Sequence, residues 1–112
     1  MAVKLKNIED QTIVITGATS GIGLCTARSA AQRGANVVLV ARNEEALRKL
    51  ADEINSGSGG KAVYAAADVS DEEALRRAAD LAESEFGGID TWVNNAGGSI
   101  YGRIMDVPMD DF

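Results

Sequence analysis

A glycine-rich turn near the start of the chain has the residue types and spacing of a phosphate-binding segment. Gly17, Gly21 and Gly23 stand between a short apolar run and a segment rich in Ala. In such a turn the first glycine allows a sharp exit from a strand, the second lets the backbone approach a pyrophosphate, and the third lets a helix pack close to a sheet. The N-terminus of that helix offers N–H groups and positive potential to an anion. Because the hydroxyls of Thr19 and Ser20 add hydrogen-bond donors, this segment is predicted to hold phosphate.

The elements on either side decide between this prediction and an ordinary tight turn, which glycines also favour. Residues 12–16 form a β-branched run that is typical of a central strand buried on both faces. Residues 22–33 have the composition of a helix that ends at Gly34, and residues 36–41 form a second apolar run. A strand, turn, helix and strand with these glycines in the first turn predict dinucleotide binding.

The rest of the chain continues the alternation. Asn43 is predicted to cap a second helix, and the low-complexity segment 55–60 is predicted to be a flexible turn. Ser70 and Glu73 have the spacing of a capping box that opens a third helix running to Phe86. The four apolar runs predicted as strands are residues 12–16, 36–41, 61–67 and 89–93.

Strands that alternate with crossover helices predict an α/β fold, a Rossmann-type doubly wound parallel sheet with helices on both faces. The 112 residues fit a single dinucleotide-binding domain, residues 1–112. They supply only four strands, fewer than the two halves of a doubly wound sheet, so the sheet is expected to be incomplete. With the strand order three, two, one, four, the fourth strand is expected to leave an open apolar edge.

Composition disfavours several classes of function. The formal net charge of −6 argues against nucleic acid as a partner. The chain has no histidine, so Ser-His-Asp catalysis and a His-based metal site are impossible within it, and no metal ligand is predicted. Its single cysteine, Cys25, is expected to be a packed, inert thiol. Neither a signal-peptide pattern nor a membrane-spanning apolar run is present, so no membrane partner is expected and the chain is expected to be cytoplasmic.

Three motifs in order resemble the classical short-chain dehydrogenase/reductase family. The first is the T-G-x-x-x-G-I-G spacing that begins at Thr16; the others are Asp68-Val69 after the third predicted strand and Asn94-Asn95-Ala96-Gly97 after the fourth. The resemblance covers residues 6–112. Each of the later two motifs alone also fits a plain strand end or turn; the three together favour a cofactor site at the carboxyl ends of the strands.

The resemblance also implies roles for these residues. Asp68 and Val69 would contact the adenine, with the Asp68 carboxylate accepting from its amino group. Asn95, Ala96 and Gly97 would line the ribose side of the cofactor. Asn94 would stabilise the central sheet.

The end of the second predicted strand bears on the choice between NAD and NADP. NAD-binding sheets usually carry an acid there, which pairs with the ribose hydroxyls. This chain has Arg42 followed by Asn43, and a guanidinium can hold the 2'-phosphate of NADP through a bidentate contact. An exposed surface arginine is the alternative. NADP is therefore predicted in preference to NAD. The residues predicted to bind the cofactor are Gly17, Thr19, Ser20, Gly21, Ile22, Gly23, Arg42, Asn43, Asp68, Val69, Asn95, Ala96 and Gly97.

The catalytic motif that the resemblance implies is not found in this sequence. The family transfers hydride between a nicotinamide and a carbonyl or alcohol, with a tyrosine in Tyr-x-x-x-Lys as acid or base and a serine assisting. Tyr64 is followed four positions later by Asp68, and Tyr101 by Met105, so neither begins that motif. Without the nearby ammonium, nothing lowers a tyrosine pKa from about 10 towards neutrality. No catalytic residue is predicted, and the chain alone is expected to be inactive.

Two interpretations remain open. The chain is expected to be the cofactor-binding half of an NADP-dependent oxidoreductase that acts on a small carbonyl or alcohol. It would then be a fragment of a longer domain, and the full-length form is expected to be a homo-oligomer. The alternative is a non-catalytic nucleotide-binding or interaction module, complete at 112 residues, that covers its open edge with a partner.

Overall fold

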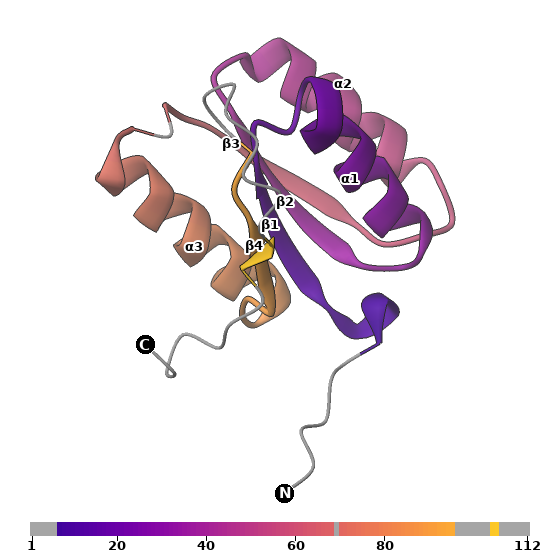
Figure 1. Cartoon of the computed structure of the whole chain (residues 1–112). Helices are drawn as coiled ribbons and strands as arrows, with labels where there is room; N and C mark the ends of the chain where they lie inside the picture. Colours follow the sequence, from indigo (N-terminus) through magenta and orange to yellow (C-terminus); the bar gives the residue numbers. More distant parts are fainter. Residues whose placement is uncertain (1–6, 69, 96–103, 106–112) are drawn as a thin grey trace, which may run out of the picture.

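The computed structural model describes residues 7–68, 70–95 and 104–105. Strands and helices alternate along the chain, as the apolar pattern predicts (Figure 1). The strands are β1 (Thr12–Thr16), β2 (Asn36–Ala41), β3 (Ala62–Ala66), β4 (Thr91–Val93) and β5 (Ile104–Met105). The helices are a short 3-10 helix η1 (Ile8–Asp10), α1 (Gly21–Gln32), α2 (Glu44–Asn55) and α3 (Glu72–Phe86).

The strands form one sheet in the order β3-β2-β1-β4-β5, in which β1 to β4 run parallel. The predicted order of the first four strands and the Rossmann-like α/β architecture are confirmed. The sequence pattern does not predict β5, which pairs antiparallel with β4 and places Met105 opposite Trp92. The expectation of an open edge at β4 is therefore wrong at the paired residues, because a two-residue strand lies against them.

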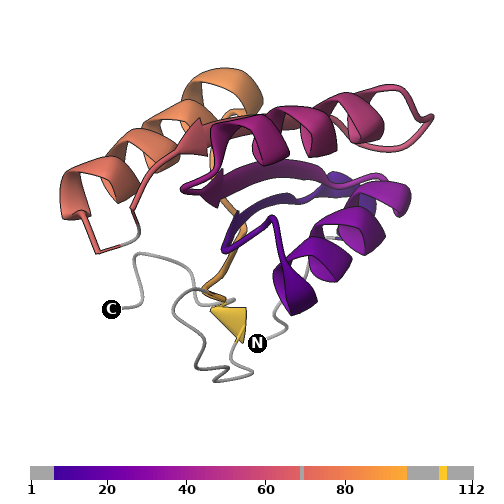
Figure 2. The ribbon, with the colours of Figure 1, turned by 90° about the horizontal axis from the view of Figure 1, so that it is seen from above.

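Alternate residues of the central strand face two separate cores. Ile13 and Ile15 of β1 belong to the core under α1 and α2, whereas Val14 packs with Ala78 and Ala82 of α3. All five residues of β1 are buried, as a parallel strand covered on both faces requires. Figure 1 shows α1 and α2 on one side of the sheet and α3 on the other, and Figure 2 shows the strands between α1 and α3.

The N-terminus of α3 corrects one predicted boundary. The capping box of Ser70 and Glu73 does not form. Instead Asp71 is the N-cap, and its Oδ1 accepts from the N–H of Glu73 at 3.0 Å. Because the helix begins one residue later than the capping box requires, the Ser70 hydroxyl is not used by the helix and donates to Asp68 at 2.8 Å.

The turn between α2 and β3 packs more closely than a flexible turn. A Cβ added to Gly60 would lie 1.7 Å from the carbonyl oxygen of Ala35, and one added to Gly59 would lie 2.1 Å from that of Ala31. The N–H of Gly60 also donates to the Ala31 carbonyl at 2.9 Å. The prediction of a turn is confirmed, but its flexible character is not: these glycines allow close approach to the end of α1.

The single cysteine does not have the packed environment that the sequence predicts. Cys25 is exposed rather than packed. The buried face of α1 consists of Gly23, Ala27, Ala30 and Ala31, and Cys25 lies off that face. Trp92 packs against the α3-side core. In the part of the chain that the structure describes, no helix is long and apolar enough to cross a bilayer.

Candidate functional site

The glycine-rich turn leaves β1 in the conformation that the predicted site requires. Gly17, directly after the strand, has φ +63°, and Gly21, the first residue of α1, has φ +57°. Side chains other than hydrogen strain the backbone in this region, so both positions favour glycine. Among the described residues, nothing lies within 4 Å of the position that a Cβ of Gly21 would occupy. The turn is therefore open to a ligand at Gly21.

Gly23 brings the turn against the end of β4. A Cβ at this position would lie 2.1 Å from the carbonyl oxygen of Gly17 and 2.7 Å from Nδ2 of Asn95. Only glycine allows α1 to approach this closely. The first and third glycines of the motif and the Asn95 side chain are thus neighbours, although 72 residues separate Gly23 from Asn95 in the sequence.

Thr16 links β1 to β4 at the same place. Its side chain is buried, with 1% of the residue exposed. The hydroxyl donates to Oδ1 of Asn94 at 2.8 Å and accepts from the N–H of Asn95 at 2.9 Å. Asn94 is thus joined to the end of β1 through Thr16, which is consistent with its predicted role in the central sheet. The sequence does not single out Thr16; the available signal is a hydroxyl residue at the end of a strand whose three central positions are apolar.

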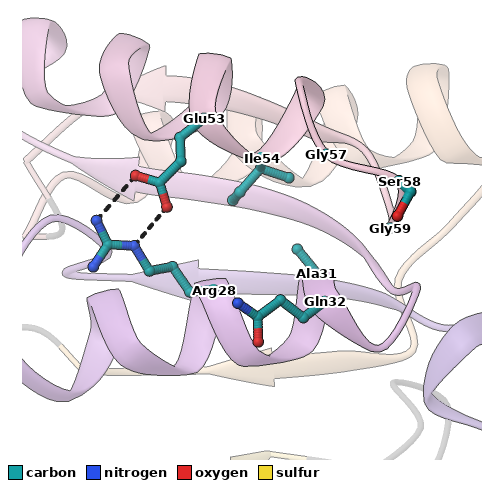
Figure 3. A pocket seen from close by; sticks show the side chains of 8 residues that line it. All are labelled: Arg28, Ala31, Gln32, Glu53, Ile54, Gly57, Ser58 and Gly59. Carbon is teal, nitrogen blue, oxygen red and sulfur yellow. Dashed lines mark hydrogen bonds and ion pairs between the residues drawn. The ribbon is translucent and has the colours of Figure 1, made fainter.

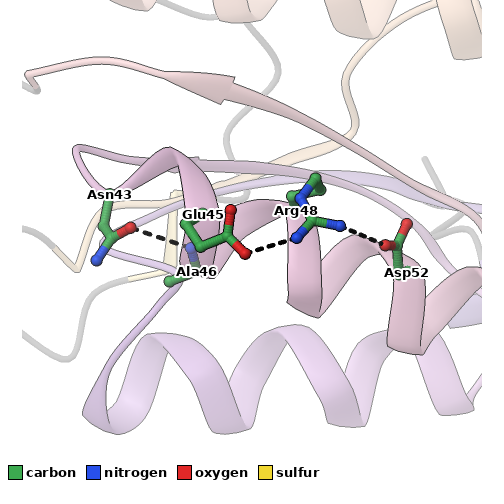
Figure 4. A network of polar contacts seen from close by, with 5 residues as sticks. All are labelled: Asn43, Glu45, Ala46, Arg48 and Asp52. Atoms are coloured by element: carbon green, nitrogen blue, oxygen red, sulfur yellow. Dashed lines mark hydrogen bonds and ion pairs between the residues drawn. The ribbon is translucent and has the colours of Figure 1, made fainter.

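The N-terminus of α1 differs from those of the other two α-helices, α2 and α3, in its capping. Ser20 is its N-cap and forms no side-chain capping hydrogen bond. In α2, by contrast, Oδ1 of Asn43 accepts from the N–H of Ala46 at 3.0 Å (Figure 4), and Asp71 caps α3. Ile22, in the first turn of α1, is 50% exposed. Uncapped N–H groups and positive potential at a helix N-terminus suit a phosphate.

Arg42 and Asp68 lie at the same edge of the sheet as this turn. The register pairs Ala41 of β2 with Ala66 of β3, and the N–H of Ala67 donates to the Ala41 carbonyl at 2.8 Å. Arg42 and Asp68 therefore leave neighbouring parallel strands at nearly the same level. Both side chains are exposed.

Arg42 and Asp68, the two charged residues at this edge, differ in the contacts of their side chains. In the described residues the Arg42 guanidinium forms no ion pair. Arg48 is engaged by Glu45 and Asp52 along the surface of α2, as Figure 4 shows. Hydrogen bonds from the backbone and hydroxyl of Ser70 lower the pKa of Asp68, and the charge of Arg42 lowers it further. Asp68 is therefore ionised at neutral pH.

The structure brings together predicted residues from four strand ends. The glycine turn follows β1, Arg42 and Asn43 follow β2, Asp68 follows β3, and Asn95 follows β4. The oxygen of the Asn43 side chain is already used to cap α2. Val69, Ala96 and Gly97 lie outside the described residues, as does Tyr101. The arrangement fits the rule that open parallel sheets bind ligands beyond the carboxyl ends of their strands.

Two further hollows have linings without any of the predicted residues. One, of about 360 Å³, lies between α1, α2 and the turn at 57–59, beside the ion pair of Arg28 and Glu53 (Figure 3). Another, of about 520 Å³, lies beside α1, β1 and β4 and includes Cys25. Neither hollow is part of the edge that carries the phosphate-binding turn.

Comparisons with known proteins agree with this geometry. The family model for short chain dehydrogenases matches residues 11–112. An uncharacterised oxidoreductase, YxnA, of Bacillus subtilis is 56% identical over 109 residues, which are 97% of this chain and 30% of that protein. The D-beta-hydroxybutyrate dehydrogenase of Rhizobium meliloti is 37% identical over 103 residues, 91% of this chain and 40% of that protein.

Solved structures give the same result. L-sorbose reductase from Gluconobacter frateurii, complexed with NADPH and L-sorbose, matches with a TM-score of 0.74 and 37% identity over 90% of this chain and 38% of its own. The 3-ketoacyl-(acyl-carrier-protein) reductase from Brucella melitensis, complexed with NADH, matches with a TM-score of 0.73 and 41% identity over 81% of this chain and 36% of its own. The chain thus spans about 30 to 40% of these relatives. With the family model, these matches show that the chain belongs to the short-chain dehydrogenase/reductase family and corresponds to its N-terminal region.

Proposed function

We propose that this chain is the cofactor-binding part of an NADP-dependent oxidoreductase that transfers hydride to or from a small carbonyl or alcohol. The observation that carries the choice of NADP is Arg42, an exposed guanidinium directly after β2. An acid in this place would pair with the ribose hydroxyls of NAD, whereas a guanidinium suits the extra 2'-phosphate of NADP. The relatives do not decide the matter, because one neighbour was solved with NADPH and another with NADH.

The remaining contacts of the cofactor follow from the same edge. The uncapped N-terminus of α1 would receive the pyrophosphate. Asp68, ionised and exposed, would accept from the adenine amino group. Asn95, held by Thr16 and lying against Gly23, would define the ribose side. These residues bind and orient a cofactor; the cofactor itself supplies the hydride chemistry.

The same proposal assigns no turnover to the 112 residues alone. Tyr64 is half-buried in β3 and packs against the core under α1 and α2, and no lysine stands four residues after it. Tyr101 also lacks that lysine. The family's acid or base role requires a tyrosine with a lysine four residues later, which neither Tyr64 nor Tyr101 has.

Titration of the purified chain with NADPH and with NADH, followed by nicotinamide fluorescence, tests the choice of cofactor. We expect tighter binding of NADPH. Arg42→Ala is expected to weaken NADPH about 10- to 100-fold, because a charge-assisted bidentate contact is lost, and to leave NADH within about twofold. Arg33→Ala removes an exposed arginine at the other end of α1 and is the matched control. Equal weakening of both cofactors by Arg42→Ala would overturn the assignment.

Assays of NADPH oxidation with a panel of carbonyl compounds test the proposed lack of turnover. NADPH oxidation by the 112-residue chain alone would contradict the absence of acid and base machinery. Binding without turnover is the expected result, and turnover is expected only with a polypeptide that supplies the Tyr-x-x-x-Lys motif.

A further inference from the structure

Arg42 and Asp68 place opposite charges close together where the cofactor's adenosine end would lie. The β2–β3 register and the hydrogen bond from Ala67 to the Ala41 carbonyl bring the two residues to one edge. Hydrogen bonds from Ser70, and to a lesser extent the charge of Arg42, lower the pKa of Asp68. Arg42 and Asp68 nevertheless form no ion pair within 4.0 Å in the described residues.

Ser70 donates two hydrogen bonds to one oxygen of the Asp68 carboxylate. Oδ1 of Asp68 accepts from the Ser70 N–H at 2.9 Å and from the Ser70 hydroxyl at 2.8 Å. The N–H of Asp71 donates to the Asp68 carbonyl at 2.9 Å and closes the same turn. In the described residues these are the only side-chain hydrogen bonds of Asp68, so its orientation depends on Ser70.

The Ser70 hydroxyl is not needed to start α3. Asp71 caps that helix through the N–H of Glu73. The spacing of Ser70 and Glu73 suits a capping box, but the Ser70 hydroxyl donates to Asp68 instead. Since Ser70 is exposed, the hydroxyl also contributes little to the core.

A carboxylate released from Ser70 would compete with a phosphate for Arg42. Carboxylates and phosphates accept from the same fork of guanidinium N–H groups. An ion pair between Asp68 and Arg42 would occupy donors that the 2'-phosphate needs, and it would bring a negative charge towards that phosphate. NADH has no 2'-phosphate, so its binding would not suffer in this way.

We propose that Ser70 is a positioning residue for cofactor selection: by holding Asp68 on its own turn, it keeps Arg42 available for the 2'-phosphate of NADP. This inference rests on the proposed NADP preference. It adds a residue that does not itself touch the phosphate, and it gives Asp68 a second role beside the adenine contact.

The first test compares serine variants by titration with NADPH and NADH. Ser70→Ala is expected to lower the NADPH to NADH affinity ratio about three- to tenfold, the scale of one hydrogen bond, while any loss of the adenine contact lowers both affinities together. Ser70→Thr keeps the hydroxyl and is expected to restore the wild-type ratio. Ser84→Ala is the matched control, because Ser84 is an exposed serine of α3 whose hydroxyl donates to the Leu81 carbonyl of its own helix. Circular dichroism checks that each variant is folded.

The second test removes the competing charge. In Ser70→Ala/Asp68→Asn the released side chain no longer attracts Arg42, so the NADPH to NADH affinity ratio is expected to return to the wild-type value or above it. Loss of the adenine contact lowers both affinities together and leaves the ratio intact. A Ser70→Ala variant that weakens both cofactors equally, or a double variant that does not recover the ratio, would overturn the inference.

The two proposals fail separately. If the wild-type chain does not prefer NADPH, or if Arg42→Ala leaves the preference intact, the proposed function is wrong. If Arg42→Ala removes the preference but Ser70→Ala does not change it, only the role of Ser70 is wrong. In the Arg42→Ala background, Ser70→Ala is expected to change neither affinity selectively.

Discussion

The two ends of α1 meet glycine-rich turns that differ in how they hydrogen-bond to the helix. At the N-terminal end, Ser20 forms no side-chain capping hydrogen bond, and no atom of the described part of the chain lies within 4 Å of a Cβ position at Gly21. At the C-terminal end, the Ala31 carbonyl accepts from Gly34 and from Gly60, both at 2.9 Å. The N-terminal, open end leaves backbone N–H groups without a side-chain cap, whereas at the C-terminal, closed end a backbone carbonyl accepts hydrogen bonds from the protein itself.

This difference shows why glycine content alone does not identify a site. Glycine serves at both ends because backbone must approach backbone closely. What separates the ends is the direction of the unpaired groups: a helix N-terminus presents donors that suit an anion, whereas a C-terminus presents carbonyls that a following turn can satisfy. The flanking strand and helix make the first turn the proposed phosphate site, and the closing hydrogen bonds make the second a packing element.

The largest expected effect tests the closed end. Gly60→Ala would place a Cβ 1.7 Å from the Ala35 carbonyl, and backbone atoms on both sides must then shift. We expect a loss of about 3 kcal/mol or more in the free energy of unfolding, measured by urea denaturation. Cofactor affinity of the folded fraction is expected to stay unchanged, since the turn lies at the far end of α1.

Gly57→Ala is the control for this change. Its Cβ would lie 3.4 Å from the Ile54 carbonyl, an ordinary contact, so stability is expected to stay within about 0.5 kcal/mol of the wild type. If Gly60→Ala were as harmless as Gly57→Ala, the closed end would be a flexible turn after all, and the contrast between the two ends would collapse.

The next effect tests the open end. Gly23→Ala would bring a Cβ 2.1 Å from the Gly17 carbonyl and 2.7 Å from Nδ2 of Asn95. We expect a stability loss of about 2 kcal/mol. Unlike Gly60→Ala, it is also expected to weaken NADPH and NADH alike by more than about tenfold, because the turn and Asn95 must move apart. An unchanged affinity in folded Gly23→Ala protein would show that this end is built for packing too.

Thr16→Val sharpens the comparison by acting on the link between β1 and β4. The change leaves the N–H of Asn95 and Oδ1 of Asn94 without their partner, at an expected cost of about 1 to 3 kcal/mol. Both cofactors are expected to bind more weakly, because Asn95 loses its support.

Thr91→Val is the matched control for Thr16→Val. Thr91 is also buried in the sheet, and its hydroxyl donates to Oε1 of Gln11 at 2.7 Å, away from the site. We expect a similar stability loss with unchanged cofactor binding. Equal effects of the two variants on binding would mean that the Thr16 hydroxyl acts on the sheet as a whole.

Much of this arrangement follows from local sequence signals. The β-branched run before Gly17 predicts a central strand, and Asn43 predicts the cap of α2; both are confirmed. Arg42 and the end of β2 are likewise placed by the apolar run that precedes them. These signals succeed because each depends on residues only a few positions apart.

The predictions that fail depend on contacts between distant residues. Gly59 and Gly60 have the composition of a linker, and only the position of α1 makes their small size necessary. Thr16 reads as one more β-branched strand residue until β4 brings Asn94 and Asn95 to it. Ser70 is the exception, because its alternatives are local: it fits two hydrogen-bonding patterns, and the carboxylate two residues before it, together with a better cap one residue after it, decides between them.

The smallest effect concerns the ion pair that joins α1 to α2 beside the closed end. Arg28 Nε donates to Glu53 at 2.7 Å and Nη2 at 3.0 Å, but both side chains are exposed (Figure 3). The hydrogen bond from Arg28 lowers the pKa of Glu53 below its ordinary value of 4.5. A carboxyl group with a lowered pKa stabilises the fold above its unfolded pKa, and that stabilisation is lost as the pH falls through the folded pKa.

Arg28→Ala is therefore expected to lower the urea midpoint slightly at pH 7, by far less than Gly60→Ala, since exposed pairs contribute little. The difference from the wild type is expected to shrink as the pH falls below 4.5 and through the lowered pKa of Glu53, and also in high salt. Gln32→Ala, another exposed position of α1, controls for loss of side-chain packing. A midpoint difference that stays the same on acidification would mean that Arg28 stabilises the closed end through contacts of its alkyl chain, and the pairing of α1 with α2 would then rest on packing alone.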